Sequence, residues 1–202
     1  MRRVPASAKL AAVDRYWFVT FTTYGTWLPG DRRGSVTRVR DQATAAYPRA
    51  KRNTPGTPAE PPMPALEHYA ALAMRAGPVL LNQRQAGLLL PQFHETARYR
   101  GWSLPAVAIM RNHVHVVVGV NGDPEPSTLL RDLKSYGSRV LNADRGGAPR
   151  RWWTASGSHR RLADEAAVIA AMRYVRDQVA PLVVWVDPTA AVGPIGPRFT
   201  DD

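Results

Sequence analysis

The fold is most constrained by residues 110–120, which read Met-Arg-Asn-His-Val-His-Val-Val-Val-Gly-Val. The valines and the lack of proline predict a buried β-strand. Because side chains alternate along a strand, His113 and His115 point to one face and the even-numbered valines point to the other. Two imidazoles on one face suit two ligands of one divalent metal ion, but they also suit a hydrogen-bonded pair near a sheet edge. The strand alone leaves both interpretations open.

The length and composition predict one folded domain with appendages. The chain has 202 residues, of which 45% are hydrophobic, and this is enough for a single core. Prolines crowd residues 38–64, which predicts a flexible insertion, and the proline and glycine content beyond Asp187 predicts a loose tail. We therefore expect one domain over residues 1–186, with the insertion inside it, and a tail over residues 187–202.

The charge and the lack of cysteine narrow the function. Lys and Arg number 27 against 16 Asp and Glu, a formal net charge of +11 that favours a polyanionic partner, above all nucleic acid. The chain has no cysteine, which excludes disulfides and thiolate metal sites. The sequence contains neither an apolar run of about 18 residues nor a secretory leader pattern, so we expect a cytoplasmic protein with no membrane partner.

The order of the predicted elements indicates the fold class. Periodicity predicts strands over residues 16–23, 102–109, 114–120 and 152–162, and helices over residues 65–74, 83–100, 127–143 and 165–178. Residues 183–186 are too few to classify. The order strand, helix, strand, strand, helix, strand is that of a ferredoxin-like split βαβ sandwich, an α+β fold with an antiparallel sheet. An extra C-terminal helix follows it.

Polar residues mark the expected helix starts. Asn82, with Gln85 three residues later, forms a capping box, and Ser127 and Asp164 are the expected N-caps of the two later helices. Pro91 is expected to kink the helix that Asn82 opens, because proline removes a backbone hydrogen bond.

A turn rich in glycine and proline covers residues 24–34, directly after the first strand. An exposed Trp27 could stack on a base here while Arg32 and Arg33 hold phosphates. Alternatively, Trp27 fills an edge of the core. Both interpretations stay open.

The helix after the histidine strand carries Lys134-Ser135-Tyr136. If a divalent ion on the two histidines held a phosphate, the Tyr136 phenol could attack the phosphorus. Tyr136 also lies at helical spacing from Leu129, Leu133 and Val140, which is the pattern of an ordinary packed aromatic residue. The helix by itself does not decide between a nucleophile and a core residue.

Three segments together resemble a known family. They are residues 16–34 (YWFVTFTTYGTWLPGDRRG), 110–119 (MRNHVHVVVG) and 133–142 (LKSYGSRVLN). This combination resembles the REP-associated tyrosine transposases, which belong to the single-strand DNA transposases of insertion sequences within the HUH endonuclease superfamily. The resemblance covers most of residues 14–180, apart from the proline-rich insertion.

The resemblance implies a reaction and its residues. His113 and His115 would hold Mg²⁺ or Mn²⁺, and Tyr136 would attack a phosphodiester of single-stranded DNA to leave a 5′-phosphotyrosine and a free 3′-hydroxyl. Rejoining would reverse this step with another 3′-hydroxyl. The implied partner is hairpin-bearing single-stranded DNA, bound by a monomer or a homodimer. The residues expected to contact DNA are Trp27, Arg32, Arg33, Arg111, Lys134 and Arg139.

One departure from the family pattern concerns the metal site. Family members often carry Gln or a similar polar residue one helical turn after the tyrosine, whereas Val140 stands there in this chain. Asp132 or Asn142 could replace the missing ligand, with water and DNA oxygens filling the rest of the shell. Alternatively, the chain is a catalytically weakened or domesticated protein that only binds hairpin DNA or RNA. A hydrolytic metal phosphoesterase is a third interpretation.

Overall fold

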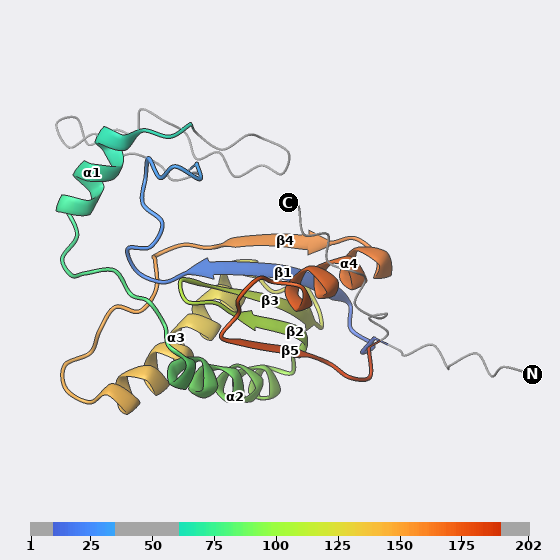
Figure 1. The fold of residues 1–202 in the computed structure, drawn as a ribbon. Coiled ribbons are helices and arrows are strands. Elements are labelled where there is room, and N and C mark those ends of the chain that lie inside the picture. The colour runs from blue at the N-terminus through green and yellow to red at the C-terminus, as the bar shows by residue number, and fades with distance from the viewer. Residues whose placement is uncertain (1–9, 35–60, 191–202) are drawn as a thin grey trace, which may run out of the picture.

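A computed structural model describes residues 10–34 and 61–190, which form an antiparallel five-stranded sheet and four helices. The strands lie in the order β4-β1-β3-β2-β5 (Figure 1). They are β1 (Arg15–Thr22), β2 (Ser103–Ile109), β3 (His113–Val120), β4 (Ser158–Leu162) and β5 (Val183–Val186). The helices are α1 (Pro64–Leu72), α2 (Gln83–Arg100), α3 (Pro126–Arg145) and α4 (Glu165–Arg176). The predicted ferredoxin-like α+β sandwich with an extra C-terminal helix is confirmed.

The histidine strand, β3, is the central strand of this sheet. It pairs in antiparallel fashion with β1 on one side and with β2 on the other. In the register with β1, Thr20 lies opposite His115 and Thr22 lies opposite His113. The predicted alternation holds, because Val114, Val116, Val118 and Val120 belong to one core and Val117 belongs to the other.

The sheet separates two cores, and different helices cover its two faces. The even-numbered valines of β3 pack against α2 and α3, through residues such as Phe93 and Leu133. Val117 packs against α4, through Met172 and Val175. In Figure 1, α4 lies in front of the sheet and α3 passes behind it. The histidines therefore face the side of the sheet that α4 covers.

Two of the three expected helix starts are confirmed. Asn82 and Gln85 form a reciprocal capping box at α2, and Asp164 accepts a hydrogen bond from the Ala167 backbone N–H at α4. Ser127 is wrong as the cap of α3, because the N-cap is Glu125. Proline directly follows Glu125, and it suits the first helical position since its fixed φ is already helical and it has no N–H to satisfy. Pro91 lies inside α2, and its kink stays a prediction.

The prediction of a strand over residues 152–162 is only partly correct. β4 begins at Ser158, and the earlier part contributes one isolated bridge between Trp153 and Thr23. Trp152 and Trp153 are buried in the core, so the chain bends here to insert two indole rings and does not continue the regular strand. Residues 183–186, which the sequence did not classify, form the edge strand β5.

Some expectations fall on residues that the structure does not describe. Residues 38–60 of the expected insertion and residues 191–202 of the expected tail lie outside the described residues. The short helix expected over residues 65–74 is α1.

In the described part of the chain, none of the helices has both the length and the apolar character that crossing a membrane requires.

Candidate active site

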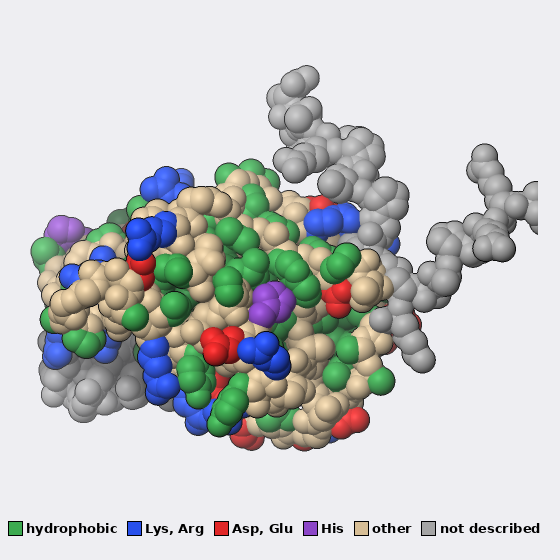
Figure 2. Space-filling model, turned by 90° about the horizontal axis from the view of Figure 1, so that it is seen from below, with side chains coloured by type: hydrophobic (Ala, Val, Ile, Leu, Met, Phe, Trp, Pro, Cys, Tyr) green, Lys and Arg blue, Asp and Glu red, His purple; other side chains and the backbone are tan. Residues whose placement is uncertain are grey.

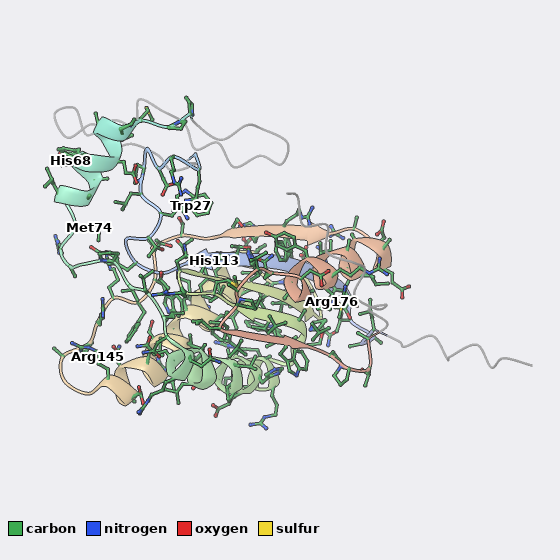
Figure 3. All side chains as sticks on the ribbon, in the orientation of Figure 1. Trp27, His68, Met74, His113, Arg145 and Arg176 are labelled. Atoms are coloured by element: carbon green, nitrogen blue, oxygen red, sulfur yellow. The ribbon has the colours of Figure 1, made fainter. Side chains whose placement is uncertain are left out.

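The two histidines of β3 form the centre of the candidate site. Their ring centroids are 4.6 Å apart and the rings are nearly perpendicular. His115 is buried, with 6% of its surface exposed, and its ring stacks on Phe18 of β1 at 5.5 Å. Figure 3 shows His113 at the end of the sheet, below the loop that carries Trp27. As strand alternation predicted, both imidazoles lie on the same face of β3, next to each other.

Hydrogen bonds hold one nitrogen of each ring. The Nδ1–H of His113 donates to the side-chain oxygen of Asn112 at 2.7 Å. Nδ1 of His115 lies 2.8 Å from the Thr20 hydroxyl, which can accept from Nδ1–H. When Nδ1 carries the proton, Nε2 has a free lone pair, and this tautomer is the one that a metal ligand needs. The neighbours of both rings therefore leave Nε2 available for ligation.

Both imidazoles are neutral at physiological pH. Burial lowers the pKa of His115 to about 3, and the nearby His113 adds to this effect. Burial also lowers the pKa of His113, with a further contribution from the positive charge of Arg33. Protons do not compete with a metal ion at such nitrogens near neutral pH.

The tyrosine next to the histidines is Tyr174, in the last turn of α4. Its ring lies 5.3 Å from the His115 ring and 5.7 Å from the Phe18 ring, measured between centroids. About half of its surface is exposed (53%), so the side chain remains open to solvent. α4 brings Tyr174 to this point because Met172 and Val175 anchor the helix on the histidine face of the sheet.

Gln178 lies four residues after Tyr174, just beyond the end of α4. Its side-chain nitrogen donates to the Tyr174 carbonyl oxygen at 3.0 Å, which ties the amide group to the end of α4. The amide oxygen is the kind of donor that Mg²⁺ and Mn²⁺ accept. Within residues 10–34 and 61–190, no group of three His, Cys, Asp or Glu side chains could hold a metal ion. Two imidazoles are a donor set that would fit a hard cation only together with further oxygen ligands, such as an amide oxygen, water or phosphate oxygens.

Tyr136 lies elsewhere, so the structure does not bring it to the histidines. It belongs to α3, whose Leu129 and Leu133 pack on the valine face of the sheet, opposite the histidine face. Arg139, one of the expected DNA contacts, lies over the Tyr136 ring with its guanidinium carbon 4.8 Å from the centroid. Figure 3 shows Arg145, at the end of the same helix, well away from His113.

The two expected substitutes for a third ligand are also occupied elsewhere. The Asp132 carboxylate is buried and pairs with Arg100 at 2.8 Å and with Arg131 at 3.1 Å. The side-chain oxygen of Asn142 accepts from the Arg150 backbone N–H and from the Trp152 indole. Both residues belong to α3, and both are wrong as members of the histidine site.

Comparison with known proteins decides the family. The family described as "Transposase IS200 like" matches residues 78–178, half of the chain. The chain belongs to the IS200-like transposases. The matched segment contains β3 with its histidines and α4 with Tyr174, but it ends at Gln178 and excludes β1.

Solved structures similar to this IS200-like transposase include two with transposase titles. One is "Structure of the REP associates tyrosine transposase bound to a REP hairpin", 12% identical, with a TM-score of 0.44, 87% of this chain and 70% of that chain covered. The other is a putative transposase from Deinococcus radiodurans R1, 13% identical, with a TM-score of 0.40, 89% of this chain and 99% of that chain covered. A search of the curated proteins found no match.

Sequence reasoning missed the tyrosine that this IS200-like transposase carries beside its histidines. The available signal was Tyr174-Val-Arg-Asp-Gln178, a tyrosine with glutamine four residues later, whereas Tyr136 has Val140 at that position. The resemblance assigned the nucleophile to Tyr136, whose helix comes directly after the histidine strand. Proximity along the chain was misleading, because α3 packs on the valine face of the sheet, opposite the histidines.

The loop residues that were expected to contact DNA differ in whether their side chains are free to do so. Trp27 is partly exposed (42%), and its indole N–H donates to the Gly34 carbonyl at 2.8 Å, so it does not fill the core. Arg33 lies over the Trp27 ring and pairs with the buried Asp31. Arg32 and Arg111 are exposed. Arg33 therefore holds the loop together, whereas the other three side chains face solvent.

Lys134 also has a structural function that the sequence did not predict. Its ammonium group donates to the carbonyls of Thr154, Ala155 and Ser156, at 2.5, 3.2 and 3.3 Å. Burial lowers its pKa to about 8. Lys134 thus fastens the segment before β4 to α3.

Proposed function

We propose that this IS200-like transposase cleaves and rejoins hairpin-bearing single-stranded DNA through a 5′-phosphotyrosine on Tyr174, with a divalent metal ion held by His113 and His115. The observation that carries the proposal is the 5.3 Å separation between the Tyr174 and His115 rings. Gln178 supports it, because its amide oxygen, four residues after the tyrosine, would supply the third protein ligand that Val140 could not.

The reaction needs few groups. The Tyr174 oxygen attacks the scissile phosphorus and forms an O–P bond, while the bond to the 3′ oxygen breaks and a 3′-hydroxyl is released. The phenolic proton leaves to solvent, to which the half-exposed side chain is open. Because the covalent link conserves the phosphodiester energy, attack by another 3′-hydroxyl on the phosphotyrosine rejoins the strand without a nucleotide cofactor.

The metal ligands and the nucleophile would come from two different elements of the fold. Mg²⁺ or Mn²⁺, when bound, would withdraw charge from the scissile phosphate. His113 and His115 would offer neutral Nε2 atoms from the central strand, and Gln178 would offer its amide oxygen from just beyond the end of α4. Phe18 packs against both His115 and Tyr174, which fixes the ring of the nucleophile relative to the ligands.

Single-stranded DNA with a hairpin is the substrate that agrees best with the motifs and with the net charge of +11. The reason to suspect a weakened or domesticated protein was Val140, and it does not apply to Tyr174, which has Gln178 at the corresponding position.

Covalent trapping tests the proposal. The protein is incubated with Mn²⁺ and a pool of 3′-labelled oligonucleotides that carry a hairpin flanked by randomised single strands, and adducts are resolved on a denaturing gel. We expect a labelled adduct that Tyr174→Phe abolishes and that the matched variant Tyr136→Phe retains. An adduct that survives Tyr174→Phe would refute the assignment.

A further inference from the structure

A groove runs along α3 on the valine face of the sheet, and the candidate active site does not use it. It lies between α3 and residues 150–159, has a volume of about 580 Å³, and is here called the α3 groove. Its wall on α3 presents Ser127, Arg131, Ser135 and Ser138, which recur at helical spacing along one side of the helix. Hydroxyls and a guanidinium thus form a continuous row.

The charge of the α3 groove has one sign. Its lining includes four basic side chains, Arg131, Lys134, Arg150 and Arg151, and none of the described residues that line it is acidic. Lys134 is occupied by backbone carbonyls and Arg131 pairs through Nε with the buried Asp132, but the side chains of Arg131 and Arg151 are both exposed, on opposite walls. By contrast, the side of the molecule where α2 runs shows acidic and basic side chains interspersed (Figure 2).

The groove suits a sugar–phosphate backbone better than bases. Guanidinium and hydroxyl groups are the donors that most often contact phosphate oxygens. The two aromatic residues in the lining, Trp152 and Trp153, are 2% and 5% exposed, so their rings are not available as stacking platforms for bases. The side chains of the groove therefore favour contacts with the DNA backbone that do not depend on the nucleotide sequence.

The edge strand β4 connects the groove to the histidine face. His159 lines the α3 groove, while the next residue, Arg160, lies over Phe18 on the face where His115 stacks. Among the described residues, β4 has no strand on its outer side, so a bound polymer can cross this edge. Both faces of β4 thus carry groups that attract phosphates.

We propose that the α3 groove binds the sugar–phosphate backbone of the DNA substrate, which then passes around the β4 edge to Tyr174. This inference rests on the proposed function, because it assigns a second contact surface to the same DNA. It predicts that the groove contributes affinity and little sequence preference.

The first test compares two double variants in equal conditions. Arg131→Gln with Arg151→Gln removes one charge from each wall of the groove, and Arg84→Gln with Arg98→Gln removes two exposed charges from α2. Binding of a fluorescein-labelled hairpin oligonucleotide with single-stranded flanks is measured by anisotropy in EDTA over a range of salt concentrations. The groove variant should bind roughly tenfold more weakly, with a salt slope lower by about one to two. The α2 variant should bind like the parent protein.

The second test keeps both arginines of the groove in place. The chain has no cysteine, so Ser135→Cys creates a single thiol in the groove and Glu95→Cys creates a control thiol on α2. Bound hairpin DNA should slow maleimide labelling at residue 135 and leave labelling at residue 95 unchanged. Equal labelling rates at residue 135 with and without DNA would overturn the inference, even if the arginine variants were unstable.

The outcomes separate the groove from the proposed function. If the parent protein forms the Tyr174 adduct while the groove variant binds with unchanged affinity and salt slope, the groove inference is overturned and the proposed function stands. If the parent protein neither binds the oligonucleotide nor forms an adduct, both are overturned.

Discussion

Tyr174 and His115 lie in edge-to-face contact with their ring centroids 5.3 Å apart, although one belongs to the last helix and the other to the central strand. Phe18 contacts both rings, so the three aromatic side chains form one packed group. The group contains both the proposed nucleophile, Tyr174, and a proposed metal ligand, His115. Packing in the core therefore fixes the position of one relative to the other.

Removing the amide of Gln178 should weaken metal binding. We expect Gln178→Ala to lower the affinity for Mn²⁺ by roughly tenfold or more, because the ion loses one of its few protein ligands. Gln178→Glu is the matched variant and should retain or increase the affinity, since a carboxylate is a stronger ligand for a hard cation. Titration of Mn²⁺ followed by electron paramagnetic resonance measures both. Equal affinity in the parent and in Gln178→Ala would exclude this residue from the site.

Thr20 should position His115 for ligation. Thr20→Val keeps the shape of the side chain but removes the acceptor at Nδ1, so we expect the Mn²⁺ affinity to fall by roughly 10 to 100-fold. Thr20→Ser should restore it. Nitrogen chemical shifts of the His115 ring report the tautomer directly, and an unchanged tautomer in Thr20→Val would contradict the positioning role.

Acid should destabilise the metal-free protein through His115. In the unfolded chain this imidazole takes up a proton near pH 6.5, whereas burial lowers its pKa to about 3 in the folded state. Between these values the unfolded state binds the extra proton, so the free energy of unfolding falls as the pH falls below 6.5. Urea unfolding from pH 7.5 to 4.5 checks this, with His115→Gln as the comparison. A pH dependence of the same size in the variant would show that other groups cause it.

Lys134 should stabilise the segment before β4. Lys134→Met keeps much of the aliphatic stem but removes the donor to three carbonyls, and we expect the free energy of unfolding to fall by about 1–3 kcal/mol. Hydrogen exchange should accelerate around residues 154–158, more than in α2. Urea unfolding and exchange rates identical to those of the parent would refute this role.

The sequence predicts the sheet well because local pattern and tertiary environment agree there. β3 is buried on both faces, so its alternation of histidine and valine determines which residues share a face in any antiparallel sheet. The caps at Asn82 and Asp164 are local devices, and both were predicted correctly. Ser127 failed because a neighbouring proline competes for the same helix start.

The choice of tyrosine is a tertiary property. Tyr136 and Tyr174 both lie on amphipathic helices, and the helical pattern shows which side of a helix is apolar but not which face of the sheet that side covers. α3 packs on the valine face and α4 on the histidine face, and this alone separates Tyr136 from His115 and brings Tyr174 to it. By itself the sequence determined the strand, its two histidines and the family resemblance. Only the packing of the helices on the two faces of the sheet decided which phenol stands beside the imidazoles, because a contact between distant segments depends on the topology of the whole domain.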